Sequence, residues 1–526
     1  MPLIGSRRTL ISRRPQQTYT SPSRYSFMGT GMRWPNTGSA TTNVFHVTEW
    51  YFGTPDYPVT DPRVFATSFY SPTAGETLLA AGASITIQGW AIEVSSGTWV
   101  ACDGASSSGL ATIDNTVAGS LLPRIPTTLA ANTVYRARIA FFVSSAGITI
   151  PRTTFDVLNA AGGPVRTQSS ASTLFSYLST STTLNNTGLS YLPAYMIAKG
   201  GDGRPAFVAF GDSIGAGVNH SQVGAAWTAR NAMGYIEVAL DDKTTSKRLA
   251  LFNSCVPGNR PCGPSGWDQQ ANWANKIAAL QAAYAVQGAW PFDFIISQHI
   301  TNAVPYTYDS GELRTGMGRY YTLLKSLFGK PITQIEGLPG TTTSNGFQTV
   351  AGETPASGKG YPTTSHGDMW FFNADVGIDG IPDPSTYYRT NGYIEDSVGA
   401  WRYASADLAS NRPLWALRSF TTTLAAAAAQ NATSVSMTAA PTVGATLYIQ
   451  ASDGTWSSIG RNVKTVSGSG PYTVTFDGTP ISASVGAASG AVVQEAPSEG
   501  LHPSALLHRN VLVQSMIDWK TRRGWI

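Results

Sequence analysis

The stretch VAFGDSIGAG, Val208–Gly217, joins an apolar run to a glycine-rich turn. The apolar run begins at Ala206 and ends at Phe210, which predicts a short buried strand, and the glycines after it predict a tight turn. Ser213 follows the strand, where a rigid support would hold its hydroxyl near the surface, as a nucleophile requires. The alternative interpretation is a polar turn after a strand, since short motifs also arise by chance.

Composition and charge narrow the class of protein. With 526 residues, the length indicates roughly three or four domains, and 42% hydrophobic residues suffice for real cores. Only 13% of the residues are charged, which is typical of β-rich, secreted or particle-borne proteins. The net charge of +4 is small and dispersed, so nucleic acid is not expected as a partner. No apolar run approaches the ~18 residues of a membrane span, and no apolar stretch of a secretory signal follows the first arginines.

The N-terminal part predicts an arm, a β-sandwich and a linker. Residues 1–43 are rich in Pro, Ser, Gln, Thr and arginine, which predicts an extended basic arm. Along 44–160 strand patterns follow one another, and at Gly89 the apolar phase slips by one residue, as at a β-bulge. We therefore expect an antiparallel β-sandwich there, followed by a Ser-, Thr-, Gly- and Asn-rich linker at 161–202.

From Pro205 the pattern changes to alternating strands and helices, which predicts a parallel sheet covered on both faces. The strand candidates are 206–210, 248–256, 292–300 and 331–337. Two helical stretches between them carry apolar residues on one face: Trp273, Ile277, Leu280 and Tyr284 in the first, and Leu313, Met317, Leu324 and Phe328 in the second. Residues 203–419 are thus expected to form the first part of an α/β/α domain.

A small all-β insertion is expected to interrupt this α/β/α domain. Residues 420–496 alternate apolar residues with Ser and Thr between Gly-rich turns. Residues 497–526 return to a helical pattern and complete the domain, with one apolar stripe formed by Ala505, Leu512, Met516 and Trp519. The expected fold class is therefore multidomain: an N-terminal antiparallel β-sandwich and a three-layer α/β/α domain with a small all-β insertion.

Glu499 and His502 lie three residues apart, just before the last helical stretch. A serine that attacks an ester needs a base, normally a histidine oriented by a carboxylate. A loop with this spacing can place the carboxylate beside the imidazole. Together with Gly-Asp-Ser at the exit of the first strand of the α/β/α domain, the pair predicts a catalytic triad of Ser213, His502 and Glu499.

These motifs resemble the sequence blocks of the SGNH (GDSL-type) hydrolases, a family of esterases and acetyl-esterases with a flavodoxin-like parallel sheet in a three-layer fold. The resemblance covers about 203–418 and 497–526. The matching segments, in the order of the four blocks, are Gly211–Ser213, Asn253–Gly258, Phe294–Asn302 and Glu499–Pro503.

The resemblance implies a role for each matched residue. Ser213 would be the nucleophile and His502 its base. The backbone N–H of Ser213, the N–H of Gly258 and the side-chain amide of Asn302 would form the oxyanion hole. No metal or cofactor is required.

Two positions depart from the family pattern. The third block has Ile300 and Ala303 where the family has glycine and aspartate. The acid of the triad is Glu499 rather than aspartate, so the triad geometry is relaxed or the histidine relies on a backbone carbonyl.

Other residues are weaker candidates. Asp212 and His299 are expected near the pocket. The sequence leaves open a Cys255–Cys262 disulfide, although free buried thiols are favoured. A calcium site is disfavoured because EF-hand spacing is missing from the acidic residues of one Gly-rich loop, Asp375, Asp379 and Asp383.

A competing interpretation is the nucleophile elbow of the α/β-hydrolases, because Gly211–Gly215 also fits G-x-S-x-G. That fold needs several strand–helix units before the elbow. Upstream of Phe207 the sequence predicts only a β-sandwich, so the SGNH interpretation is preferred.

The order of modules, and the residues TTTLAAAAAQNATSVSMTAAPTVGATLYI of the insertion, are similar to bacteriophage tail-fibre and tailspike proteins. This implies a virion-borne esterase that removes O-acetyl groups from bacterial surface polysaccharide, made in the host cytoplasm, with other virion proteins as partners and a homotrimer expected. The alternatives are an exported bacterial esterase and a structural or receptor-binding virion protein whose SGNH fold only binds sugar.

Overall fold

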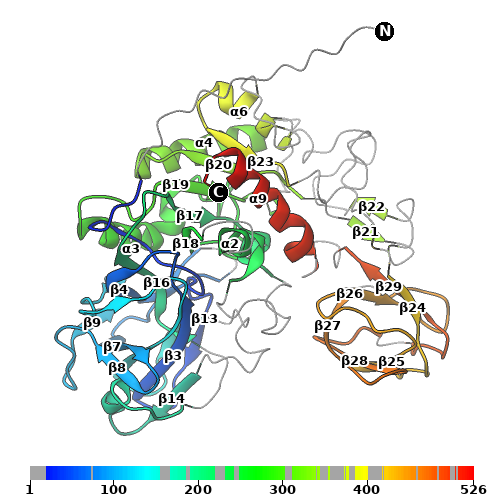
Figure 1. Ribbon diagram of the computed structural model, residues 1–526, viewed down its shortest axis with the longest axis horizontal. Helices are drawn as coiled ribbons and strands as arrows, with labels where there is room; N and C mark the ends of the chain where they lie inside the picture. Colours follow the sequence, from blue (N-terminus) through cyan, green and yellow to red (C-terminus); the bar gives the residue numbers. More distant parts are fainter. Residues whose placement is uncertain are drawn as a thin grey trace.

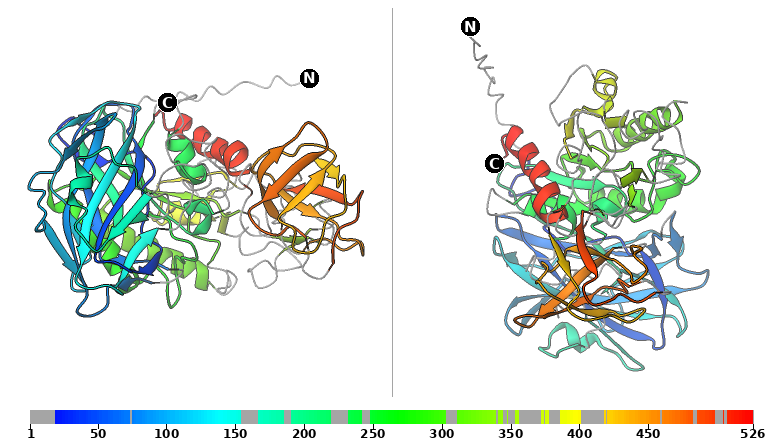
Figure 2. Two further views of the ribbon diagram at one scale, coloured as in Figure 1. Left: turned by 90° about the horizontal axis from the view of Figure 1, so that it is seen from below. Right: turned by 90° about the vertical axis from the view of Figure 1, so that its right-hand side faces the viewer.

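The computed structural model shows two larger antiparallel β-sheets with smaller ones beside them, a parallel sheet with helices, and a separate small β-module (Figure 1). The left view of Figure 2 shows the N-terminal sheets and the small module at opposite ends of the molecule. None of the described helices is long and apolar enough to span a bilayer. The structure describes residues 19–525 except 73–74, 154–165, 185–189, 219–231, 242–247, 303–310, 339–340, 344–346, 348–352, 356–371, 374, 378–385, 401–417, 419, 458–459, 482–484, 498–503 and 505–506.

The N-terminal part consists of antiparallel sheets. The first contains β1 (Tyr25–Phe27), β16 (Pro193–Lys199), β4 (Val59–Thr67) and β10 (Gly119–Leu121), with β11 (Thr128–Leu129) also on β4. The second contains β14 (Arg166–Ser170), β3 (Phe45–Gly53), β12 (Val134–Val143), β7 (Ser84–Ser95) and β8 (Thr98–Ala101), with β9 (Ala111–Asp114) on β7. Shorter elements are β2 (Thr37–Ala40), β5 (Phe69–Tyr70), β6 (Thr77–Leu78), β13 (Thr149–Thr153), η1 (Phe175–Leu178) and β15 (Ser190–Tyr191).

The expected bulge at Gly89 is confirmed. In the pairing of β7 with β12, Gly89 lies opposite Ala140 and Ile87 lies opposite Phe141, so one residue of β7 is left over. This extra residue shifts the side chains of β7 from one face of the sheet to the other, which explains the phase slip in the sequence.

The expected arm and linker differ from the structure. β1 lies in the predicted arm and pairs with β16, which lies in the predicted linker, with Phe27 opposite Ile197. Phe27 and Trp34 are only 1% and 2% exposed. The prediction of an extended segment is therefore wrong for the described residues of the arm. Its aromatic side chains are buried partly by residues more than 160 positions away in the chain, such as Tyr195 against Phe27, and local composition does not reveal such partners.

The parallel sheet has the strand order β18-β17-β19-β20-β23. All four pairings are parallel. The first strand in the chain, β17, thus lies between the second and the third, which is the order 2-1-3-4-5 of doubly wound α/β sheets. The bounds are β17 (Ala206–Phe210), β18 (Ala250–Asn253), β19 (Phe294–Ser297), β20 (Ile332–Ile335) and β23 (Asp396–Val398).

Helices lie on both faces of this sheet because β17 buries alternate residues on opposite sides. Phe207 and Ala209 share a core with α2 (Gly234–Asp241) and α9 (Val513–Arg522). Val208 and Phe210 share a core with α3 (Ala274–Ala285) and α4 (Glu312–Phe328). The remaining elements of this part are α1 (Ser213–Ala216), η2 (Gln270–Trp273), β21 (Thr341–Thr343), β22 (Glu353–Pro355), α6 (Tyr387–Thr390) and the π-helical turn η5 (His508–Leu512).

The expected apolar faces of these helices are mostly correct. All four residues predicted for the second stretch are buried, as are Leu512, Met516 and Trp519 of the last one. Tyr284 is the exception: it is 40% exposed, because it lies at the end of α3 and contacts Trp290 instead of the core. Ala505 lies outside the described residues.

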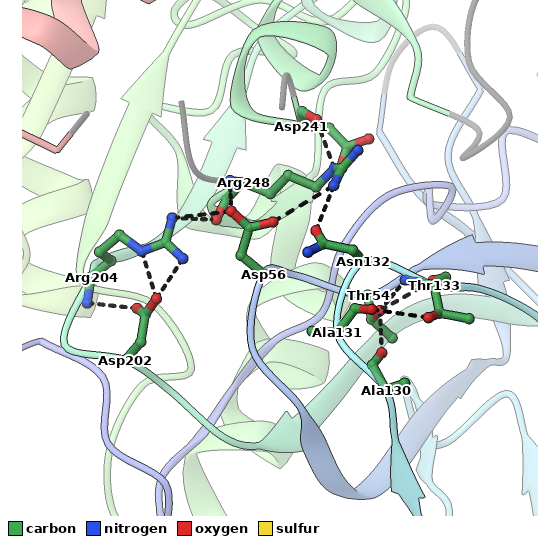
Figure 3. Close-up of polar contacts among 10 residues, drawn as sticks. All are labelled: Thr54, Asp56, Ala130, Ala131, Asn132, Thr133, Asp202, Arg204, Asp241 and Arg248. Atoms are coloured by element: carbon green, nitrogen blue, oxygen red, sulfur yellow. Dashed lines mark hydrogen bonds and ion pairs between the residues drawn. The ribbon is translucent and has the colours of Figure 1, made fainter. Parts of the chain in front are cut away.

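The N-terminal sheets and the parallel sheet share one continuous core and a network of charges (Figure 3). Asp56 precedes β4 and accepts a hydrogen bond from the backbone N–H of Arg248, which precedes β18 (2.7 Å). The guanidinium of Arg248 also donates to the side chain of Asn132, and Arg204 forms an ion pair with Asp56 (3.8 Å). The two parts are therefore fastened by a shared buried core and by partly buried polar contacts rather than joined by a free linker.

The small β-module has its own core, formed by side chains such as Val435, Leu447 and Val474. Its two ends lie side by side, because Thr421 of β24 pairs with Gln494 of β29. Its six-stranded antiparallel sheet has the order β24 (Thr421–Thr423), β29 (Val492–Ala496), β26 (Thr446–Ile449), β27 (Arg461–Ser467), β28 (Tyr472–Phe476) and β25 (Ser434–Met437).

Candidate active site

Ser213 lies where the direction of the strand order changes, at the carboxyl end of β17 between β18 and β19. In doubly wound sheets, ligands bind at this switch point. Asp212 is the N-cap of α1, and its Oδ1 accepts a hydrogen bond from the N–H of Ile214 (2.9 Å). Ser213 is only 5% exposed, which is less than expected, because the loops after β18 and β19 pack closely around it.

The glycines on either side of Ser213 are required by close packing. A Cβ at Gly211 would lie 2.7 Å from both the Sγ of Cys255 and the Oε1 of Gln298. At Gly215 the corresponding distances would be 2.6 and 2.7 Å. Any larger residue would push the neighbouring strands away from α1. The close packing at Gly211 and Gly215 explains why the turn after the apolar run is rich in glycine.

Gln298 is a site residue that the sequence analysis missed. Its Oε1 accepts hydrogen bonds from the N–H groups of Gly215 (2.8 Å) and Asp212 (3.2 Å), and its own N–H donates to the carbonyl of Phe210 (2.8 Å). It thereby fixes the first turn of α1 relative to β19. In the sequence, Gln298 is marked only by its place directly after the apolar run of β19. None of the four family blocks requires a glutamine at this position.

The predicted oxyanion residues lie on two loops that are tied together. Gly258 follows β18 in a turn with φ of +75°, a conformation that favours glycine, and its N–H donates to no described residue. The Nδ2 of Asn302 donates to the carbonyl of Asn259 (3.1 Å). A side-chain amide carries two hydrogens, so this bond orients the group and leaves its second hydrogen for another acceptor.

Both loops are also bonded to the segment that carries Ser213. The N–H of Val256 donates to the carbonyl of Gly211 (3.0 Å), and the N–H of Thr301 donates to the Oδ2 of Asp212 (3.2 Å). The Nδ2 of Asn253 donates to the carbonyl of Gly215 (3.0 Å). The structure therefore brings together the residues of the first three predicted blocks at one edge of the sheet.

The two residues expected near the pocket have internal roles. Asp212 is fully buried and joins α1 to the loop after β19. His299 is fully buried, and its Nδ1 lies 2.9 Å from the hydroxyl of Tyr320, with Trp267 packed against its ring. Both side chains are thus buried and hydrogen-bonded within the protein, and their place near the pocket stays a prediction.

Burial of His299 predicts a loss of stability in acid. Burial lowers the pKa of His299 from 6.5 to about 3, against a smaller opposing effect of the Gly211 backbone. Between these two pKa values the imidazole is protonated in the unfolded chain but not in the folded chain. The free energy of unfolding therefore falls as pH falls, by at most about 1.4 kcal/mol per pH unit. Urea unfolding at pH 7 and 4.5 should show a larger loss for wild type than for His299→Gln. Equal losses would mean that His299 is protonated in the folded protein.

The cysteines and acidic residues do not form further sites in the described part of the chain. Cys102, Cys255 and Cys262 are free and buried, so no Cys255–Cys262 disulfide is present. Asp375 forms an ion pair with Arg314 (3.0 Å), and no cluster suited to a metal ion occurs among the described residues. Asp379 and Asp383 lie outside them.

Glu499 and His502 also lie outside the described residues, but the chain on both sides of them is described. The N–H of Ser504 donates to the carbonyl of Pro497 (2.8 Å), so this loop begins and ends at one place. Leu507 then joins the same buried cluster as Ile214, the residue after Ser213.

No protein-family model matches the sequence, and no curated protein does. Among solved structures, the chain is similar to a family two carbohydrate esterase from Cellvibrio japonicus, with 14% identity over 61% of this chain and 78% of that one and a TM-score of 0.20. It is also similar to an active-site mutant of a family two carbohydrate esterase from Clostridium thermocellum (11% identity, 60% and 78% coverage, TM-score 0.20). A third similar structure is a salicylyl-acyltransferase from a tetracycline biosynthetic pathway, with 9% identity over 57% of this chain and 60% of that one and a TM-score of 0.17. At such TM-scores this likeness is weak and does not establish a common fold.

Proposed function

We propose that this protein is a serine esterase of the SGNH type that removes O-acetyl groups from bacterial surface polysaccharide. One observation carries the proposal: Ser213, Gly258 and Asn302 lie on three neighbouring loops at the switch point of the sheet, and hydrogen bonds tie these loops together. A nucleophile and convergent donors at such a position are the parts that acyl transfer requires.

In the proposed reaction, the Oγ of Ser213 attacks the acetyl carbon while His502 takes its proton. The N–H groups of Ser213 and Gly258 and the amide of Asn302 stabilise the negative oxygen. The bond to the sugar oxygen breaks, and His502 returns the proton to that oxygen. Water, deprotonated by His502, then attacks the acetyl carbon. The bond from that carbon to the Oγ of Ser213 breaks, acetate leaves, and His502 returns the proton to the Oγ.

The sequence also fits the α/β-hydrolase elbow, but the sheet disfavours this alternative. β17, which leads into Ser213, is the first strand of the parallel sheet among the described residues, and every strand paired with it follows later in the chain. An elbow in that fold follows several strand–helix units.

Hydrolysis of p-nitrophenyl esters tests the proposal. Because Ser213 is 5% exposed, we expect acetate esters to be cleaved faster than octanoate esters, and acetate to be released from O-acetylated polysaccharide. A protein that binds such polysaccharide without releasing acetate would instead be a sugar-binding virion protein. Finding this protein in purified phage particles would support a virion protein, whereas its absence from them would favour an exported bacterial esterase.

Asn302→Ala is expected to lower kcat by about 100-fold, the usual loss for one oxyanion donor. The change should leave folding nearly intact, because the side chain is partly exposed and makes one described hydrogen bond. Steady-state kinetics with p-nitrophenyl acetate measure this loss, and circular dichroism checks the fold. An unchanged kcat would remove Asn302 from the oxyanion hole.

Deletion of the small β-module is expected to leave p-nitrophenyl acetate hydrolysis largely intact. Thr421 and Gln494 are paired, so a short Gly/Ser linker in place of about 422–494 can join the two ends without moving them. The acetate that the deletion variant releases from O-acetylated polysaccharide is measured for comparison, because the module can contribute to binding the polymer. A deletion variant that folds but loses small-ester activity would show that the module positions Glu499 and His502.

A further inference from the structure

The segment Gly31–Trp34, within the predicted arm, contacts two elements that neighbour the candidate active site: the start of α2 and the loop after β18. Consecutive residues of it contact two different supports of Ser213. Arg33 forms an ion pair with Glu237 of α2, and the indole N–H of Trp34 donates to the Oγ of Ser254 (2.5 Å). Neither contact belongs to the reaction described above.

Arg33 holds the start of α2. Its guanidinium donates to the carbonyl of Met233 (3.0 Å), and the carboxylate of Glu237 accepts from the N–H groups of Met233 (3.0 Å) and Gly31 (2.9 Å). The side chains of Arg33 and Glu237 are 5% and 2% exposed. Water therefore cannot replace these bonds at low cost.

The start of α2 in turn packs against the end of α1. Gly217 ends α1 with φ of +83°, and a Cβ on it would lie 2.6 Å from the nitrogen of Gly234. A shift of Met233 and Gly234 would therefore move the short helix that Ser213 begins.

Trp34 holds the second support, the loop after β18. Ser254 is fully buried, and its N–H donates to the carbonyl of Ala209 in β17 (2.8 Å). The indole ring of Trp34 packs edge-on against Phe252 in β18, with 5.2 Å between ring centroids. Gly258, which carries a proposed oxyanion N–H, lies four residues further along this loop.

We infer that Arg33 and Trp34 are positioning residues of the esterase site: they fix the two segments that set where Ser213 and the Gly258 N–H point. The inference rests on the proposed function. It assigns the N-terminal segment to the catalytic unit, so that the β-rich part is required for turnover and is more than an attached module.

The test compares Trp34→Phe and Ser254→Ala, which each remove one partner of the same hydrogen bond. Each is expected to lower kcat for p-nitrophenyl acetate by about 10- to 100-fold with KM unchanged, because small displacements of reacting groups have such effects. The double variant should be no worse than either single one, since both lose the same interaction. Arg33→Lys keeps the charge opposite Glu237 and should retain more activity than Arg33→Met.

Trp90→Phe is the matched control. Trp90 is buried in β7, and its indole N–H also donates to a carbonyl, that of Pro123 (2.8 Å), away from the site. Titration of the serine with a fluorophosphonate counts folded sites, so a positioning role lowers kcat while the number of sites stays constant. A wild-type kcat in Trp34→Phe would overturn this inference but leave the proposed function intact. An equal loss of kcat in Trp90→Phe would do the same. A wild-type protein without ester turnover would refute the proposed function and this role with it.

Discussion

Ser213→Ala is expected to reduce ester turnover by on the order of 10³-fold or more, because nucleophile and base act as a unit and removing either disables both. The residual rate would come from the oxyanion donors alone. Alanine is accepted in the first turn of α1, where Asp212 supplies the cap, so the melting temperature should change little. Steady-state kinetics with p-nitrophenyl acetate and a thermal melt measure the two effects.

Ser297→Ala provides the matched control for this change. Ser297 is a fully buried serine at the carboxyl end of the adjacent strand β19. It should keep most of the wild-type turnover. Full activity in Ser213→Ala would remove this serine from the reaction and leave only a polar turn after a strand.

His502→Ala is expected to cause a loss of the same size, again on the order of 10³-fold or more. Combining it with Ser213→Ala should add almost nothing, since the second member of a disabled unit has no further effect. Glu499→Gln should cost less than His502→Ala, because the acid orients the base and does not itself transfer the proton.

Kinetics of all four variants, the double variant included, separate the members of this unit. If Glu499→Gln retains wild-type activity while His502→Ala does not, the histidine is oriented by another acceptor, such as a backbone carbonyl. If His502→Ala remains fully active, a different base serves Ser213.

Local patterns in the sequence were sufficient for the centre of the molecule. The apolar run at 206–210 has the same bounds as β17, and the strand candidates at 292–300 and 331–337 contain β19 and β20. The glycines around Ser213 marked a close packing that the structure shows in detail. Such features depend on residues adjacent in the chain or one helical turn apart, so periodicity and turn chemistry reveal them.

Only the tertiary structure decided which distant residues support the site. Gln298 contacts the first turn of α1 across 83 residues, Arg33 reaches Glu237 across 204, and Trp34 reaches Ser254 across 220. The polar composition of the arm favours an extended segment, yet its aromatic side chains complete a core built by other segments. A pattern within one segment reports what that segment can bury, and the packing of the whole chain determines which partner buries it.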